Sequence, residues 1–129
     1  MADIIQIQTF CLSLPEVVES FPFDETTLVF KVRNKMLALI PLERDPQVML
    51  KCHPDLAEEW RLRFPEVIPA WHMNKKHWNS VLCDGGLSWE RIQKMILHSY
   101  CMVVHGLPKK DQKELSDQIA LAEYAHPQL

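Results

Sequence analysis

Two apolar runs separated by a short polar interruption dominate residues 26–42 of the chain. Both runs are rich in Val, Phe, Leu and Ile, which favour β-strands, and between them stand Arg33, Asn34 and Lys35. Asn tolerates the positive φ of a tight turn, so the pattern predicts a β-hairpin with its tip at these three residues. Because hairpin strands are antiparallel neighbours, the fold needs an antiparallel sheet.

The remaining patterns add helices and short strands to this hairpin. Helical spacing of apolar residues and end signals predict four helices, at about residues 3–14, 54–63, 89–104 and 107–125. A third strand is predicted at residues 48–51. Residues 70–82 predict a second hairpin around the polar residues Asn74, Lys75 and Lys76, and one way to close it is a two-residue turn at Asn74 and Lys75.

Together these elements predict an α+β fold of two layers. We expect an antiparallel sheet of about five strands, two hairpins plus one strand, packed against helices. One face of such a sheet remains partly exposed, and a partner would bind there or at the hairpin tips. No repeat, low-complexity segment or linker interrupts the chain, so we expect a single domain over residues 1–129.

Length and composition agree with a globular protein that needs no metal or disulfide to fold. The chain has 129 residues, 47% of them hydrophobic, and its four cysteines form no paired spacing. We therefore expect reduced and mostly buried thiols. No apolar run approaches the roughly 20 residues of a membrane-spanning helix, and residues 1–10 lack the basic flank of a signal peptide. The expected location is the cytoplasm.

Charge is distributed unevenly along the chain. Residues 1–30 hold five acidic and no basic residues, residues 31–110 hold 13 basic and 8 acidic residues, and residues 111–129 hold one basic and four acidic residues. These blocks carry −5, +5 and −3, which sum to the net charge of −3. The middle block is the candidate anion-binding surface. The alternative is that the acidic ends neutralise the basic middle within the molecule.

The densest polar cluster lies at residues 71–79, which contain two Trp, two His and two Lys. A two-residue turn would place Trp71 opposite Trp78 and His72 opposite His77. Lysines at such a tip can reach phosphates, while the indoles either flank a nucleic acid or anchor the core. The two imidazoles could share a metal, but a closed zinc site needs four ligands, so exposed, hydrated imidazoles and no bound metal are expected.

Two further basic elements accompany this cluster. Lys109 and Lys110 stand at the predicted start of the last helix, where free N–H groups can hold an anion. Lys31, Arg33 and Lys35 would complete a basic surface if both hairpin tips face the same way. No GxSxG, HExxH, P-loop or GxGxxG motif is present, so we expect neither an enzyme nor a cofactor.

The combination of short motifs resembles the MmcQ/YjbR family over about residues 4–115. The motifs that carry the resemblance are Ser13-Leu14-Pro15, Phe21-Pro22-Phe23, residues 27–32, Leu50-Lys51-Cys52, residues 72–79 and residues 106–110. The resemblance implies a small bacterial cytoplasmic domain with a CyaY-like or secretion-chaperone-like fold, described as a double wing and proposed to bind DNA. The wings would be the hairpins around Arg33 and Asn74. Family members often have glycine turns where this chain has Arg33 and Asn34.

The sequence thus leads to two main hypotheses and a minor one. The first is a module that binds double-stranded DNA. Its lysines and Arg33 would contact phosphates, and its His and Asn side chains would make polar contacts closer to the bases. The residues are Lys31, Arg33, Lys35, Lys51, His72, Asn74, Lys75, Lys76, His77, Asn79, Lys109 and Lys110. The second is a non-enzymatic adaptor that binds a protein or small ligand on the exposed sheet face. A metal-dependent role of His72 and His77 comes third.

Overall fold

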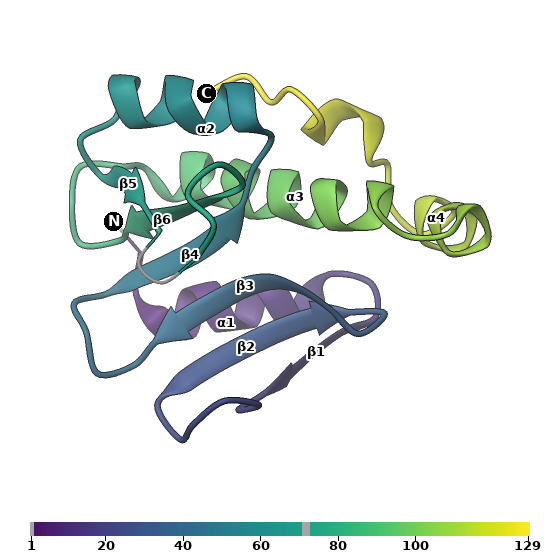
Figure 1. The fold of residues 1–129 in the computed structure, drawn as a ribbon, viewed down its shortest axis with the longest axis horizontal. Helices are drawn as coiled ribbons and strands as arrows, with labels where there is room; N and C mark the ends of the chain where they lie inside the picture. Colours follow the sequence, from purple (N-terminus) through teal and green to yellow (C-terminus); the bar gives the residue numbers. More distant parts are fainter. Residues whose placement is uncertain (1, 71–72) are drawn as a thin grey trace.

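The computed structural model describes residues 2–70 and 73–129, and it has the expected α+β architecture (Figure 1). All strand pairs of the sheet are antiparallel, and the spatial order is β1-β2-β3-β4-β6-β5. The strands are β1 (Val17–Ser20), β2 (Thr27–Val32), β3 (Lys35–Pro41), β4 (Gln47–Lys51), β5 (Val67–Pro69) and β6 (Trp78–Leu82). The sheet therefore has six strands where the sequence predicted about five.

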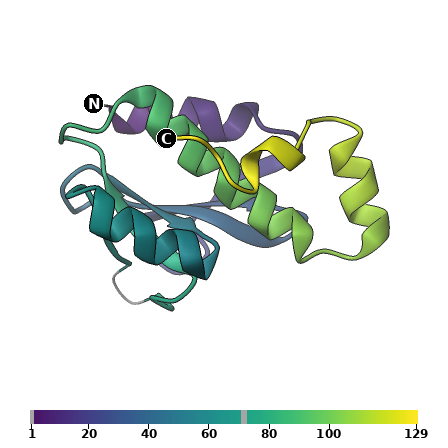
Figure 2. The same ribbon diagram turned by 90° about the horizontal axis from the view of Figure 1, so that it is seen from above.

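Helices cover one face of this sheet, as expected. The helices that contact the sheet are α1 (Ile4–Ser13), α2 (Pro54–Arg63) and α3 (Trp89–His105). Helix α4 (Lys109–Ser116) packs on α3 and is followed by the short 3-10 helix η1 (Ala122–Tyr124). Figure 2 shows α1 and α3 on the same side of the sheet, above the strands in that view, while α4 lies at one end of the molecule. No helix among the described residues has the length and apolar character needed to cross a membrane.

The first hairpin forms where the sequence predicted it. Arg33 and Asn34 have φ of 48° and 66°, so both turn residues are in the left-handed region that the two-residue turn between β2 and β3 requires. A register shift follows at Phe30 and Lys31, where β3 carries one extra residue, Leu37. Such a bulge bends the strand and changes where its side chains point.

The second hairpin differs from the prediction. Residues 67–69 form strand β5, which pairs with β6, so that Pro69 lies opposite Asn79 and a longer loop joins the two strands. The predicted two-residue turn at Asn74 and Lys75 is wrong. β5 ends at Pro69 and is an edge strand, where the missing N–H of proline is tolerated. The predicted pairs of Trp71 and His72 lie outside the described residues.

The ends of the chain bring two further corrections. Strand β1 was not predicted, because it has only four residues and one of them alone is buried. It follows Glu16, whose φ of 61° turns the chain back from α1. The last helix ends at Ser116 rather than near residue 125, because the chain must bend to bury both Leu115 and Leu121.

Two hydrophobic clusters hold the layers together. The larger lies between the sheet and the helices and extends from Ala2 to Leu121. The smaller lies on the opposite face of the sheet, where Val29, Leu39 and Met49 are buried together with Ala70 and Trp78. The face away from α1 and α3, which we call the open face, thus has an apolar centre of its own.

Candidate functional site

The open face carries lysines and no carboxylate among its strand positions. Side chains alternate between the two faces along a strand, so Lys31 on β2 and Lys51 on β4 share the open face with Val29 and Met49. The only acidic residue within any described strand is Glu19, opposite Phe30 on the helix-covered face. Cationic side chains on the open face therefore have no strand carboxylate beside them.

Strands β3 and β4 separate at one end of this face. Their ladder contains only two residue pairs, Ala38 with Leu50 and Leu39 with Met49. The next pair in this register would be Leu37 with Lys51, but there the Ser99 hydroxyl of α3 lies between the two strands. It donates to the Leu37 carbonyl at 2.5 Å and accepts from the Lys51 N–H at 2.9 Å. Ser99 thus replaces a direct hydrogen bond between the strands and satisfies both backbone groups.

A pocket of about 290 Å³ lies at this separation. Its lining residues are Lys35, Met36, Lys51, Trp78, Val103 and Gly106. We call it the split pocket. Lys35 and Lys51 form no ion pair with any residue that the structure describes. Trp78 is only 8% exposed and belongs to the smaller hydrophobic cluster, so it acts as a core anchor and wall rather than as a stacking platform.

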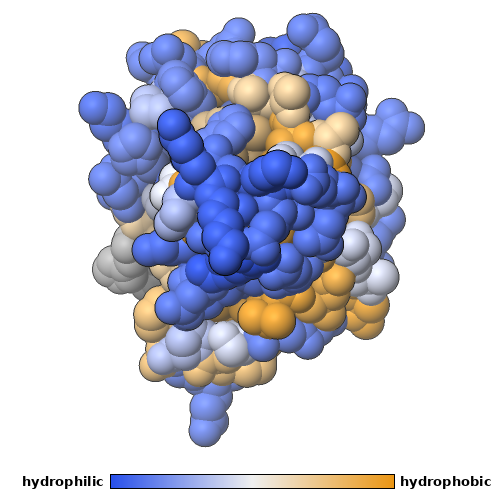
Figure 3. Space-filling model, turned by 90° about the vertical axis from the view of Figure 1, so that its right-hand side faces the viewer, coloured by the Kyte–Doolittle hydropathy of each residue, from blue (hydrophilic) through white to orange (hydrophobic). Residues whose placement is uncertain are grey.

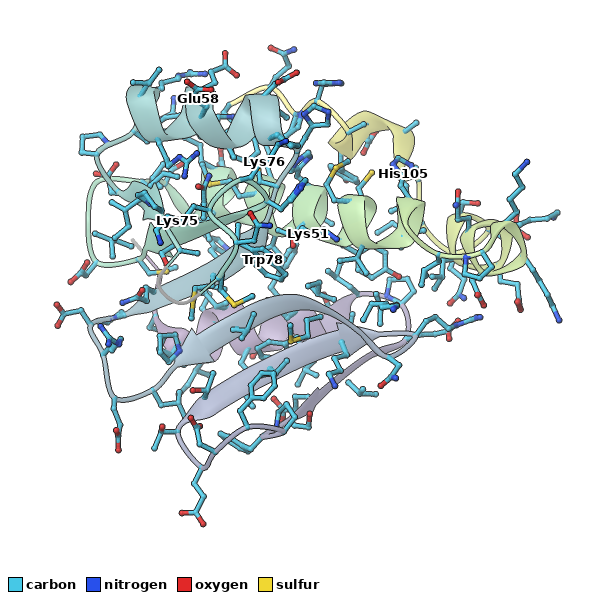
Figure 4. The ribbon with its side chains drawn as sticks, viewed as in Figure 1. Lys51, Glu58, Lys75, Lys76, Trp78 and His105 are labelled. Carbon is cyan, nitrogen blue, oxygen red and sulfur yellow. The ribbon has the colours of Figure 1, made fainter. Side chains whose placement is uncertain are left out.

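Lys75 and Lys76 stand on a turn in the loop that leads into β6 (Figure 4). The Asn74 side chain accepts from the Lys76 N–H at 2.9 Å, and the His77 N–H donates to the Asn74 carbonyl at 3.1 Å. Arg61 of α2 fixes the turn from outside by donating to the Lys75 carbonyl at 2.9 Å. Both lysine side chains are exposed. The turn is thus built by short-range hydrogen bonds that leave its two ammonium groups free to meet solvent or a ligand.

Arg33, in contrast, is occupied within the molecule. Its guanidinium binds both carboxylate oxygens of Glu16, at 2.7 and 2.9 Å, and also pairs with Asp111 and, at 3.5 Å, with Glu114 of α4. These hydrogen bonds and charges hold the pKa of Arg33 above its usual value, and the bond from Arg33 lowers the pKa of Glu16. For Arg33, therefore, the structure shows the alternative of internal neutralisation by both acidic ends, and a phosphate contact from Arg33 stays an untested prediction.

The remaining polar candidates are Asn79, His77 and His72. Asn79 was expected to contact nucleic acid, but it is buried toward α2, where its amide donates to the Ala57 carbonyl at 3.3 Å. The contact stays an untested prediction, and in this structure β6 turns Asn79 to the helix-covered face. His77 is half-buried and its carbonyl accepts from the Cys52 N–H at 2.8 Å. His72 lies outside the described residues.

Lys109 and Lys110 are exposed in the first turn of α4. This helix starts after Pro108 without a side-chain cap, and Asp111 in the same turn pairs with Arg33. Figure 3 views this end of the molecule and shows a strongly hydrophilic surface in front, with hydrophobic side chains beside it. In Figure 1, α4 lies at the opposite end from β5. Lys109 and Lys110 therefore stand apart from the turn that bears Lys75 and Lys76.

The four cysteines are buried and unpaired, as the sequence predicted. Burial raises the pKa of Cys11 and Cys52 to about 12 and that of Cys101 to about 11, so these thiols stay protonated at neutral pH and are poor nucleophiles. No group of three or more potential metal ligands occurs among the described residues.

Sequence reasoning did not single out Ser99 or the split pocket. In the helix predicted at residues 89–104, Ser99 stands at helical spacing from the apolar residues Met95 and Val103. A hydroxyl on an otherwise apolar stripe was the available signal, because a buried Ser needs a hydrogen-bond partner. The backbone atoms that Ser99 binds depend on how β3 and β4 separate. That separation involves residues far apart in the sequence, so no local sequence pattern predicts it.

Comparisons with known proteins agree with the fold. The family model described as YjbR matches residues 12–102. The chain is 33% identical over 113 residues to the protein YjbR of Escherichia coli K12, covering 87% of this chain and 96% of that one. It is 36% identical over 105 residues to the protein YbdF of Escherichia coli O157:H7, covering 81% and 86%.

Solved structures give the same result. The crystal structure of Deinococcus radiodurans protein DR2400 has a TM-score of 0.82 and 37% identity, covering 90% of this chain and 89% of that one. A crystal structure of a Pseudomonas syringae protein has a TM-score of 0.70 and 27% identity, covering 79% and 99%. By family model, relatives and structure alike, the chain belongs to the YjbR family.

Proposed function

We propose that the protein binds the phosphate backbone of double-stranded DNA through the open face, as a binding protein rather than an enzyme. The observation that supports this most is the charge of that face: Lys31 and Lys51 lie on it, and no carboxylate occupies a strand position there. The exposed pair Lys75 and Lys76, in the loop before β6, extends the same cationic set, whereas Lys35 alternates with Met36 and starts β3 on the other side of the sheet.

Phosphate contacts suit this arrangement better than base readout does. Lysine is a flexible cation that meets phosphate oxygens without demanding a fixed geometry. Trp78 is buried, and the Asn74 side chain is used within its own turn, so neither offers a free group for reading a base. The proposed binding is therefore mainly electrostatic and only weakly selective for sequence.

The test is fluorescence anisotropy of a labelled duplex, measured between about 50 and about 200 mM salt. The logarithm of the affinity should fall linearly with the logarithm of the salt concentration. In Lys75→Ala/Lys76→Ala the slope should be shallower by about 1.8, since each lost phosphate contact removes about 0.9.

The matched control is Lys94→Ala/Lys113→Ala, which removes the same charge from α3 and α4, away from the open face. Lys94 donates to the Gln128 carbonyl and Lys113 pairs with Asp117. This control should retain the slope of the unmodified protein. Binding that does not respond to salt, or an equal loss in both double variants, would overturn the proposal.

A second candidate, a protein-binding adaptor, rests on exposed apolar side chains near the edge strand β1. Val18 is 61% exposed and Phe23 is 65% exposed, and Phe21 and Leu42 are exposed as well. Sedimentation over a range of protein concentrations tests the homotypic form of this candidate. A dimer that Val18→Lys/Phe23→Lys abolishes would favour it, whereas a monomer at every concentration would remove it.

A further inference from the structure

The split pocket combines two cations with apolar walls. Lys35 and Lys51 line it from two different strands, while Met36, Trp78 and Val103 supply its apolar surface. Among the residues that the structure describes, no acidic one lines it. Because ammonium groups without a carboxylate partner attract an anion, and apolar walls favour the burial of a hydrocarbon body, the lining suits a ligand that has both parts.

Two features of the backbone keep this pocket open. The bulge in β3 inserts Leu37 directly after Met36 and so diverts the start of the strand. Ser99 is fully buried and binds both the Leu37 carbonyl and the Lys51 N–H. Because both backbone groups already have a partner, no further hydrogen bond would form if β3 and β4 moved together here. The opening is therefore part of the folded framework and not a gap between mobile side chains.

The size of the pocket limits what it can hold. Its volume of about 290 Å³ lies at the lower end of the range for small-molecule sites, roughly 300 to 1,000 Å³. A single aromatic ring already fills a cavity of about 150 Å³. One ring, or an aliphatic body of similar size, together with one charged group is the ligand class that fits.

We propose that the split pocket binds a small organic anion, in which one carboxylate or phosphate group meets Lys35 and Lys51 and a compact apolar or aromatic body contacts Met36, Trp78 and Val103. This site goes beyond the proposed DNA contacts and does not depend on them, since its ligand needs an apolar body, which a phosphate backbone lacks.

The test is a titration followed by the amide signals of the ¹⁵N-labelled protein. Benzoate and phenyl phosphate serve as probes that have both parts; inorganic phosphate lacks the body, and benzyl alcohol lacks the charge. The two complete probes should shift the amides of Met36, Lys51 and Gly106 saturably, with a dissociation constant of about 1 mM or lower. The comparison of benzoate with phenyl phosphate decides which anionic group is preferred.

Charge-removing variants locate the anion. Lys51→Met and, separately, Lys35→Met should each weaken binding of the preferred probe by about tenfold, since each removes one charge-assisted contact but keeps an apolar stem. Lys113→Met, on the exposed side of α4, is the control and should bind as the unmodified protein does. Thermal unfolding and the dispersion of the amide spectrum check that each variant is folded, and Lys35, being exposed, tests the site even where Lys51→Met fails to fold.

Three results would overturn this proposal: no saturable shift with either complete probe, equal binding of inorganic phosphate, or equal weakening in the Lys113 variant. The duplex titration uses another ligand and other variants, so loss of DNA binding with retained probe binding would refute only the DNA proposal. The reverse pattern would refute only the split-pocket site.

Discussion

At the scale of the residue, two buried polar side chains of α3 connect distant parts of the backbone. Ser99 bridges β3 and β4, as described above. His98, one position earlier, accepts from the His53 N–H at 3.1 Å through Nε2, and its Nδ1 lies 2.7 Å from the Tyr124 carbonyl. This geometry requires a neutral ring with the proton on Nδ1, which joins the start of α2 to the C-terminal segment.

The bridging role of Ser99 predicts a defined cost of removing its hydroxyl. Ser99→Ala leaves the Leu37 carbonyl and the Lys51 N–H without their partner, so the free energy of unfolding should fall by about 1 to 3 kcal/mol. Urea denaturation measures this change. Ser116→Ala, whose exposed hydroxyl bonds only within α4, should change it by less than about 0.5 kcal/mol. An equally small effect at Ser99 would contradict the bridge.

The buried imidazole of His98 predicts a loss of stability in mild acid. Burial lowers the pKa of His98, and positive charge on His53, His126 or His105 lowers it further. Below the ordinary histidine pKa of about 6.5, His98 is protonated in the unfolded chain but stays neutral in the folded protein. The unfolded state therefore binds more protons, and the free energy of unfolding should fall as the pH falls. Denaturation between about pH 7.5 and about pH 5 measures this dependence. His98→Gln should flatten it, and an unchanged dependence in that variant would refute the assignment.

At the scale of the element, Arg33 links the first hairpin to α4. Its carboxylate partners come from the segment before β1 and from α4, two parts of the chain that are far apart in sequence. The contact also explains why a helix of eight residues, with no side-chain cap at its start, is held in place.

Removing this link should loosen α4 without affecting DNA binding. In Arg33→Met the amides of residues 109–116 should exchange with solvent faster than in the unmodified protein, as seen by hydrogen exchange. The salt dependence of duplex binding should stay the same, because Arg33 is already neutralised. Slower or unchanged exchange in α4 would contradict the link, and a shallower salt slope would return Arg33 to the DNA contacts.

Elements whose signals are local could be predicted from the sequence. The Arg33-Asn34 turn depends on neighbouring residues, and the structure has it. The helix predicted at residues 89–104 is α3, which is capped by Ser88 and ends before Gly106. Strands β1 and β5 were missed, because short edge strands are defined by the partner strand rather than by their own pattern. The turn at Asn74 was misplaced for the same reason.

At the scale of the whole molecule, the acidic and basic segments of the sequence lie on different surfaces of the protein. The acidic ends reach the first hairpin through Glu16, Asp111 and Glu114, and there they neutralise Arg33. The lysines of the open face have no such partner among the described residues. The candidate residue types could therefore be predicted from the sequence, but not which of them are neutralised, since that depends on contacts between residues up to 81 positions apart (Arg33 and Glu114).

The most direct measurement is a map of the amide signals of the ¹⁵N-labelled protein as an unlabelled short duplex is added at low salt. The open-face account predicts shifts at Lys31, Lys51, Lys75 and Lys76, with little change at Gln6 and Gln93, which line a shallow surface pocket beside α1 and α3. Shifts confined to α1 and α3, or to the first turn of α4, would contradict the assignment of DNA binding to the open face.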